Sequence, residues 1–208
     1  MKSIAKMKDH VVIAGFGVMG EHVCRELAKA KIKFVSLEND IERFANSEER
    51  GYHTLMGDAT DENMLKQAGV EQARAFISML SSDANNIITV MTARELNPSL
   101  FIISRAVEFC NKNKLHKVGA NRVITPYELS SQRIVNTVLR PNVVEFLEVM
   151  SYAPNMSLSI EEITVNESSD FAGKMIKESG LREKYNIIII GIKRKEEMFF
   201  NPAPTMEI

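Results

Sequence analysis

Three glycines near the start of the chain have the spacing of a phosphate-binding loop. Gly15, Gly17 and Gly20 form G-x-G-x-x-G directly after the β-branched run at 11–14. In this pattern the first glycine allows a tight turn, and the second lets the backbone approach a pyrophosphate. The third lets the following helix pack closely on the strand. That helix also directs free N–H groups at an anion. The spacing therefore predicts a dinucleotide-binding loop.

An acidic residue follows at about the distance expected of a ribose-binding carboxylate. Glu38 ends the apolar segment 34–37, and Asn39 comes directly after it. An acid at this position hydrogen-bonds the ribose hydroxyls in dinucleotide-binding folds, and its charge opposes a 2′-phosphate. NADP is therefore disfavoured, whereas NAD(H), ADP and ATP stay open. The alternative to a nucleotide-binding loop is that the three glycines form a turn that only packs a helix on a sheet.

A polar segment, G-D-A-T at 57–60, lies at the end of a third predicted strand. Ligands of open α/β sheets bind at the carboxyl ends of the strands. Asp58 and Thr60 offer polar groups to an adenosine at that edge. The alternative is that Thr60 or Asp61 caps the next helix, and both roles are compatible.

Two later segments lie at the same predicted edge. Arg105 lies in I-I-S-R-A at 102–106, and its planar fork suits a phosphate. A surface salt bridge is the alternative role for it. The segment 78–86, which includes Met79 and Leu80, joins a strand end to a helix start. Its side chains are expected to be caps more often than ligand contacts, and Asp83 could be either.

The pattern around these residues alternates short apolar runs with helical periodicity. This alternation predicts an α/β fold with a Rossmann-like parallel sheet and helices on both faces. The expected strands are 11–14, 34–37, 53–56, 75–79, 100–104 and 122–124, and the expected helices are 18–30, 41–50, 62–68, 83–96 and 109–118.

The remainder of the chain predicts a helix–turn–helix and a small α+β lobe. Helices are expected at 127–139 and 142–150, separated by Arg140-Pro141. The second is apolar nearly all round, which predicts burial against another subunit or against its own domain. The lobe is expected to contain strands at 158–165, 186–192 and 198–200 and a helix at 171–179, and to be truncated or to need a partner. The predicted domains are a basic lead at 1–9, a nucleotide-binding lobe at 10–126, the crossover hairpin at 127–151 and the C-terminal lobe at 156–208.

Composition excludes several classes of protein. The net charge of −1 argues against a nucleic-acid partner, and the two cysteines, Cys24 and Cys110, are expected to be small buried residues rather than a disulfide. Without a membrane-spanning run or a signal peptide, a soluble cytoplasmic protein is expected. The four histidines, His10, His22, His53 and His116, are scattered without metal-ligand spacing, and neither a P-loop nor a nucleophile motif is present.

A nucleotide site without a substrate domain predicts a sensor. An NAD(P)-dependent oxidoreductase is the first rival, and a nucleotide-sensing repressor is the second.

Together these motifs resemble the regulator of K⁺ conductance (RCK) domain family. The resemblance covers the chain from about Asp9 and includes F-A-G-K-M-I-K-E-S-G-L and N-P-A-P-T of the C-terminal lobe. It implies a cytoplasmic gating-ring domain that binds an adenine nucleotide, NAD(H), ADP or ATP, at the inner face of the membrane and acts on a potassium channel pore. It also implies a homodimer that assembles into an octameric ring. The implied cofactor-binding residues are Gly15, Gly17, Val18, Met19, Gly20, Glu38, Asn39, Asp58, Ala59, Thr60, Met79, Leu80 and Arg105.

One departure from the family concerns Ca²⁺. Calcium-gated members carry carboxylates just after the fifth strand, where this chain has Ser104-Arg105-Ala106-Val107. Hard cations need oxygen ligands, so that Ca²⁺ site is not matched, although Asp83 remains as a candidate ligand. Glu161-Glu162 could also bind a metal, but a solvated face is the preferred interpretation. The basic lead fits a channel fragment that begins after a pore helix. A separate regulatory subunit of a Trk/Ktr transporter is the alternative.

Overall fold

The computed structural model describes residues 7–152, 161–195 and 197–208. The chain divides into two compact units, Met1–Val144 and Glu145–Ile208, with the division inside one helix. The predicted lead, lobe and hairpin boundaries therefore stay predictions. Of the lead, Met7 packs against the hydrophobic core of the first unit, and the Asp9 N–H donates to the Gln72 carbonyl oxygen over 3.1 Å.

The first unit contains a six-stranded sheet whose strands are all parallel, in the order β3-β2-β1-β4-β5-β6. This is the Rossmann order, and it confirms the predicted fold class. The order reverses between β1 and β4, which creates a crevice at the carboxyl edge. The strands are β1 (Val11–Ala14), β2 (Phe34–Glu38), β3 (Thr54–Met56), β4 (Ala75–Ser78), β5 (Phe101–Arg105) and β6 (Arg122–Ile124).

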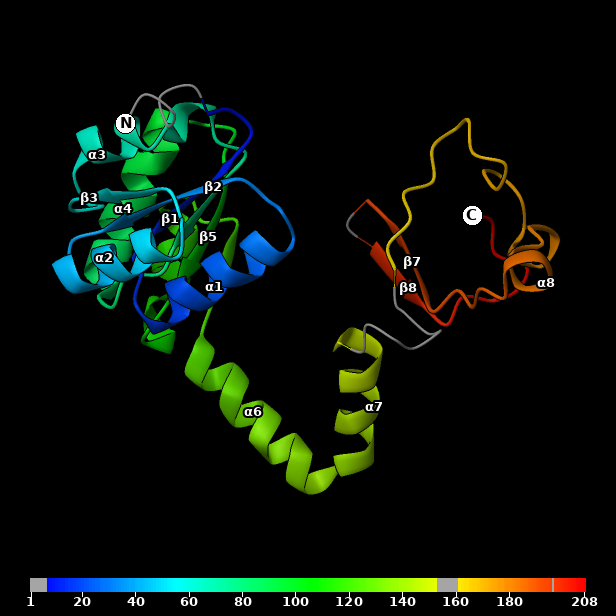
Figure 1. Cartoon of the computed structure of the whole chain (residues 1–208). Helices are drawn as coiled ribbons and strands as arrows, with labels where there is room; N and C mark the ends of the chain where they lie inside the picture. Colours follow the sequence, from blue (N-terminus) through cyan, green and yellow to red (C-terminus); the bar gives the residue numbers. More distant parts are fainter. Residues whose placement is uncertain (1–6, 153–160, 196) are drawn as a thin grey trace. The chain divides into compact units, whose positions relative to one another are not determined.

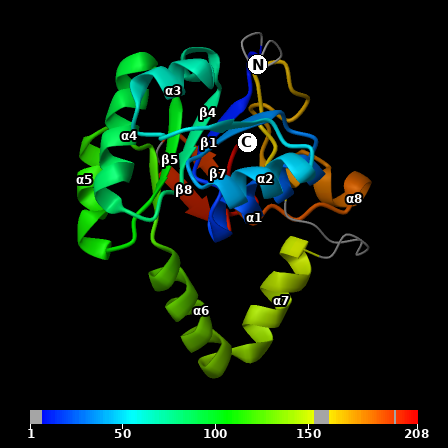
Figure 2. The same cartoon turned by 60° about the vertical axis from the view of Figure 1, so that its left-hand side comes forward.

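Helices cover both faces of the sheet, with α1 and α2 on one side and α3, α4 and α5 on the other (Figures 1 and 2). The two cores are built from alternating residues of β1, because successive strand side chains point to opposite faces. Val11 and Ile13 pack in the α1 core with Cys24, whereas Val12 and Ala14 belong to the larger core. The helices are α1 (Val18–Lys29), α2 (Ile41–Glu49), α3 (Glu62–Gln67), α4 (Asp83–Leu96) and α5 (Lys112–Lys117), with 3₁₀ turns η2 (Val70–Gln72) and η3 (Phe109–Asn111).

The expected elements of this unit are all present, with ends that differ by a residue or two. The exception is the expected helix at 109–118, which is divided into η3 and α5. Both cysteines are free. Cys24 is buried as predicted, and burial raises the pKa of its thiol to about 12. The prediction of a buried Cys110 is wrong, since η3 leaves it exposed.

The helix hairpin consists of α6 (Pro126–Leu139) and α7 (Pro141–Tyr152). Both helices begin at a proline, one residue earlier than predicted, because proline is well suited to the first helical position, where its missing N–H costs nothing. No residue of α6 is buried. Large apolar side chains on the hairpin are exposed by half or more, among them Ile134, Val138 and Phe146.

The second unit contains η4 (Ile176–Glu178), α8 (Leu181–Tyr185) and the antiparallel pair β7 (Gly191–Arg194) and β8 (Glu197–Phe200). The helix predicted at 171–179 is wrong except for η4, because Gly173 is left-handed at φ 74° and stops helical winding.

Two strand predictions in this unit also need correction. Residues 161–165 of the strand predicted at 158–165 are not in a strand, and 158–160 lie outside the described residues. The strand predicted at 186–192 starts only at Gly191, because Asn186 is left-handed at φ 55° and ends α8, a helix the sequence analysis missed. In the described part of the chain, no helix is both long and apolar enough to span a membrane.

Candidate functional site

A cavity of about 520 Å³ opens at the carboxyl edge of the sheet. Its lining comes from the segments that follow β1 to β6, so it spans both halves of the crevice where the strand order reverses. A volume of this size is typical of small-molecule and cofactor sites. The lining residues are Gly15, Gly17, Val18, Met19, Leu37, Glu38, Asn39, Arg43, Gly57, Asp58, Ala59, Met79, Leu80, Ser81, Asn85, Arg105, Pro126 and Tyr127.

The three glycines of the loop have different physical roles. Gly15 has φ 95°, and its N–H donates to the Leu37 carbonyl oxygen over 2.8 Å, which turns the chain out of β1. Gly17 is extended and begins α1, and a Cβ there would meet only the Arg43 guanidinium, at 3.6 Å. Gly20 lies away from the cavity lining, and a Cβ there would lie 1.9 Å from the Gly15 carbonyl oxygen. Gly20 therefore serves helix packing.

Glu38 lies at the end of β2 with a buried carboxylate that faces the glycine loop. Its Oε2 accepts from the Phe16 N–H at 2.6 Å, and its Oε1 accepts from the N–H groups of Asn39 and Asp40, both at 2.9 Å. A carboxylate offers about four acceptor positions, so these bonds leave one for a ligand hydroxyl. Glu38 therefore ties the loop after β1 to the loop after β2.

The segment after β3 forms a compact turn in front of α3. The Asp58 carboxylate accepts from both the N–H and the hydroxyl of Thr60, each at 2.8 Å. Asp61 caps α3 by accepting from the Asn63 N–H at 2.8 Å, so the cap is Asp61 rather than Thr60. Asp58 and Ala59 line the cavity, whereas Thr60 does not.

Arg105 ends β5 and reaches the cavity from the other half of the sheet. Its Nε is buried, and among the described residues it has no hydrogen-bond partner. A buried cationic donor without a partner is costly unless a ligand satisfies it. The salt bridge that was the alternative is not found among the described residues. The Nε–H donor of Arg105 is thus left unsatisfied by the described residues.

Asp83, at the first position of α4, holds the loop that follows β5. Its carboxylate accepts from the Val107 N–H (2.7 Å), the Glu108 N–H (3.0 Å) and the Asn111 side-chain amide (2.8 Å). Partial burial works to raise the pKa of Asp83, but these hydrogen bonds and the charge of Arg105 outweigh it and lower the pKa. Of its two possible roles, the structure therefore assigns Asp83 to loop anchoring.

We expect Asp83→Asn to lower the free energy of unfolding by about 1–2 kcal/mol at neutral pH, because the amide presents a donor where Glu108 and Asn111 also donate. The folded pKa lies below the unfolded one, so this stabilisation is complete above the unfolded pKa and is lost as pH falls through the folded pKa. Urea unfolding at pH 7 and pH 3 measures it. An equal gap between the two proteins at both pH values would contradict the anchoring role.

Asn86, a fully buried residue of α4, holds the segment after β4. Its Oδ1 accepts from the Ser78 hydroxyl at 2.7 Å and the Leu80 N–H at 3.1 Å, and its Nδ2 donates to the Leu80 carbonyl oxygen at 3.0 Å. Leu80 in turn packs against Gly15, since a Cβ on that glycine would lie 3.2 Å from the Leu80 Cδ2 atom. Asn86 therefore positions one wall of the cavity.

Asn86→Ala is expected to lower the free energy of unfolding by about 2–4 kcal/mol, because it leaves the buried polar groups of Ser78 and Leu80 without partners. Asn85→Ala is a matched control, since its exposed side chain makes no hydrogen bond among the described residues, and we expect a change within about 0.5 kcal/mol. Chemical denaturation compares the two. Similar losses in both variants would mean that the hydrogen bonds of the Asn86 side chain do not stabilise the fold.

The cavity brings together all the residues predicted for the site except Gly20 and Thr60. The 78–86 segment was expected to supply caps, and Ser82 does cap α4 by accepting from the Asn85 N–H. Ser81 and Asn85 line the cavity as well. Sequence reasoning missed Leu37, Arg43, Gly57, Ser81, Asn85, Pro126 and Tyr127 as lining residues. Three of these, Leu37, Gly57 and Ser81, directly flank a predicted residue at a strand end, so the strand-end positions carried their signal. The other four lie in α2, α4 and α6.

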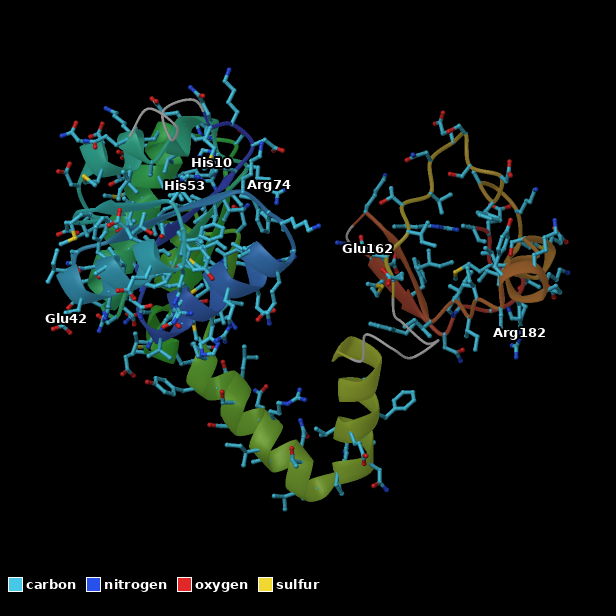
Figure 3. The ribbon with its side chains drawn as sticks, viewed as in Figure 1. His10, Glu42, His53, Arg74, Glu162 and Arg182 are labelled. Atoms are coloured by element: carbon cyan, nitrogen blue, oxygen red, sulfur yellow. The ribbon has the colours of Figure 1, made fainter. Side chains whose placement is uncertain are left out.

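The histidines do not contribute to this cavity. His10 and His53 precede β1 and β3, and Figure 3 shows them with Arg74 at the edge of the sheet opposite α6. His10 is buried and hydrogen-bonds the Ala68 carbonyl oxygen through Nε2 at 2.8 Å. Within the described residues, no group of three or more His, Cys, Asp or Glu side chains could hold a metal ion. Glu161 and Glu162 are exposed in the second unit.

Comparison with known proteins settles the family. The profile of the TrkA-N domain matches residues 11–126, and that of the TrkA-C domain matches residues 160–208. The chain belongs to the TrkA-N domain family. The resemblance to RCK domains is confirmed, because potassium channel proteins and Ktr and Trk potassium uptake proteins are among the relatives of this family member.

Potassium channel protein 1 of Methanocaldococcus jannaschii is 31% identical over 206 residues, which cover 98% of this chain and 61% of the channel protein. The chain thus spans about three fifths of that relative. Ktr system potassium uptake protein C of Bacillus subtilis is 26% identical over 200 residues, covering 96% of this chain and 87% of that protein.

Solved structures of GsuK share the fold. The GsuK channel bound to NAD matches with a TM-score of 0.55 and 24% identity, covering 93% of this chain and 34% of that chain. GsuK bound to ADP has a TM-score of 0.55 and 20% identity, covering 85% and 52%.

Proposed function

We propose that this chain is a cytoplasmic gating-ring domain that binds an adenine nucleotide and regulates a potassium channel pore at the inner face of the membrane. The observation that carries the proposal is a cavity at the switch point of the sheet, which joins the glycine loop, Glu38 and Arg105, whose Nε has no hydrogen-bond partner among the described residues. Its polar groups suit an anion next to a ribose. The NAD-bound and ADP-bound states of GsuK agree with this ligand class.

In the proposed complex, the diphosphate lies over Gly15 and Gly17 and receives the N–H groups at the start of α1. Arg105 approaches the phosphates from the β5 side, and its fork can donate two parallel hydrogen bonds. The remaining acceptor position of Glu38 takes a ribose hydroxyl, with Asn39 alongside. Asp58 and Ala59 border the adenine, and Val18, Met19, Met79 and Leu80 supply apolar contacts.

Transmission from the cavity to a pore is proposed to use the hairpin. The first turn of α6 lines the cavity, and apolar side chains further along α6 are exposed. Water-exposed apolar surface of this kind favours association, so we propose a homodimer in which the hairpin crosses to the partner, within an octameric ring. A ligand acts by binding one hinge angle near Pro141 better than another. Light scattering on the purified chain measures the assembly, and a monomer at every concentration would contradict it.

A thermal-shift panel tests the nucleotide site. NAD⁺, NADH, ATP, ADP, AMP and Ca²⁺ are added separately to the purified chain. At a concentration of one hundred times Kd, a nucleotide should stabilise the fold by about 2.7 kcal/mol, or a rise in Tm of about 5–10 °C. No shift with any adenine nucleotide would overturn the proposal. A shift with Ca²⁺ alone would move the control site away from the glycine loop.

Two other functions are tested alongside. A regulatory subunit of a Trk/Ktr transporter is the first, because Ktr system potassium uptake protein C of Bacillus subtilis is among the relatives of this chain. Copurification with a transporter membrane subunit rather than with a channel pore would select it. An NAD(P)-dependent oxidoreductase would oxidise NADH in the presence of carbonyl substrates, and absorbance at the nicotinamide band would reveal that turnover.

A further inference from the structure

Tyr127 lines the cavity although no nucleotide-binding motif includes it. It is the second residue of α6, and the turn that carries it is fixed on both sides. The Thr125 hydroxyl donates to the Glu128 carboxylate at 2.7 Å, and the Leu129 N–H donates to the Thr125 carbonyl oxygen at 3.1 Å. Pro126 restricts the backbone between them. Tyr127 is therefore held on a rigid turn at the cavity.

The ring itself has no partner in the described part of the molecule. The ring–ring contacts there join Phe16, Phe34 and Tyr52, and the Tyr127 hydroxyl makes no hydrogen bond. The residue is 66% exposed. An aromatic face of this kind is costly to leave in water but stacks well on a flat heteroaromatic ring, with little loss of side-chain entropy.

The cavity has two halves with different chemistry. The half at the carboxyl ends of β1, β2 and β3 contains the glycine loop, Glu38 and Asp58, which suit one nucleoside with its phosphates. The half at the ends of β4, β5 and β6 contains Ser81, Asn85, Arg105 and Tyr127. We expect a mononucleotide to occupy the first half, with its last phosphate towards Arg105. On this arrangement, a ligand needs a second ring beyond the diphosphate to extend to α6.

We propose that Tyr127 is the residue that recognises the second ring of a dinucleotide, by stacking on it, and so distinguishes a dinucleotide from a mononucleotide. This inference rests on the proposed nucleotide site. It gives that site a direct contact with the helix hairpin. A dinucleotide then restrains the first turn of α6, whereas a mononucleotide binds without touching that helix.

Calorimetric titration of the purified chain with NAD⁺ and with ADP tests the inference. Tyr127→Ala is expected to weaken NAD⁺ binding about tenfold and to leave the Kd for ADP within about twofold, because base–aromatic stacking has that magnitude. Tyr127→Phe should bind NAD⁺ like the wild type, since it keeps the ring. Tyr185→Ala, which removes an equally exposed ring from the second unit, should change neither affinity.

A fluorescent reporter separates stacking from a structural effect. The chain has no tryptophan, so Tyr127→Trp introduces a single indole. Stacked nicotinamide quenches indole emission, and we expect quenching by NAD⁺ but not by ADP. Equal losses of NAD⁺ and ADP affinity in Tyr127→Ala, or no loss of either, would overturn the proposal, as would quenching by both ligands. Failure of the wild type to bind any nucleotide would instead overturn the site itself, and this inference with it.

Discussion

Gly17→Asp is expected to abolish nucleotide binding while the fold keeps its stability. The loop needs a bare backbone at this position so that a diphosphate can approach, and an aspartate places a negative charge there. Two like charges about 4 Å apart repel by about 4 kcal/mol at an effective dielectric constant of 20, so at least a hundredfold loss of affinity is expected. The fold tolerates the change, because Gly17 is extended at φ −69° and a Cβ there meets only the Arg43 guanidinium.

Stability should even rise slightly in this variant. Gly17 is the N-cap of α1 and makes no side-chain capping bond, whereas aspartate is a preferred N-cap residue. The measurement is isothermal titration with NAD⁺ and ADP, paired with thermal unfolding in the absence of ligand. Gly17→Ala serves as the steric control without the charge, and its affinity should fall between those of the other two proteins. Wild-type affinity in Gly17→Asp would show that the glycine loop only packs the helix.

Glu38 is a less informative position for this test. Its carboxylate accepts hydrogen bonds from Phe16, Asn39 and Asp40, so Glu38→Ala frees three backbone donors as well as removing a ribose contact. A loss of affinity in that variant would therefore mix a disordered loop with a missing ligand contact. Gly17 separates the two effects, since the fold makes little use of that position.

Gly20→Ala is expected to lower the free energy of unfolding by more than about 3 kcal/mol. A Cβ at this position would lie 1.9 Å from the Gly15 carbonyl oxygen, which is backbone and cannot rotate away. Helix propensity predicts the opposite sign, because Gly20 is inside α1 and alanine is favoured over glycine in helices by about 1 kcal/mol. The steric effect is the larger of the two.

Urea unfolding of Gly20→Ala beside Gly17→Ala measures this difference. Both variants add one methyl group within a single turn of the same helix, and only the first places it against backbone. We expect the Gly17→Ala midpoint to fall slightly, because alanine is a poorer N-cap residue than glycine, and the Gly20→Ala midpoint to fall sharply. A Gly20→Ala protein as stable as the wild type would mean that α1 can move away from β1, and that the third glycine is not needed for packing.

The Rossmann fold of the first unit could be predicted from the amino-acid sequence alone. Strand runs, glycine turns and helix caps are local patterns, and β1 and α4 have the bounds that those patterns predict. Because ligands of parallel sheets bind where strands end, most of the site could also be predicted from strand ends alone, as Glu38 and Arg105 illustrate. The second unit was predicted less well, since left-handed residues such as Gly173 and Asn186 interrupt apolar runs that by themselves suggest longer elements.

Contacts between distant segments determine which of those side chains face the cavity and which are engaged in hydrogen bonds within the protein. Thr60 turns back to Asp58, and Asp83 is committed to the loop after β5, although both were candidates for ligand contacts. Arg43 and Tyr127 reach the cavity from helices, where no motif marks them. The physical reason is that hydrogen bonds and packing between distant segments depend on how the strands are ordered in the sheet. Local periodicity and turn chemistry indicate the elements, but not which side chains of distant elements meet.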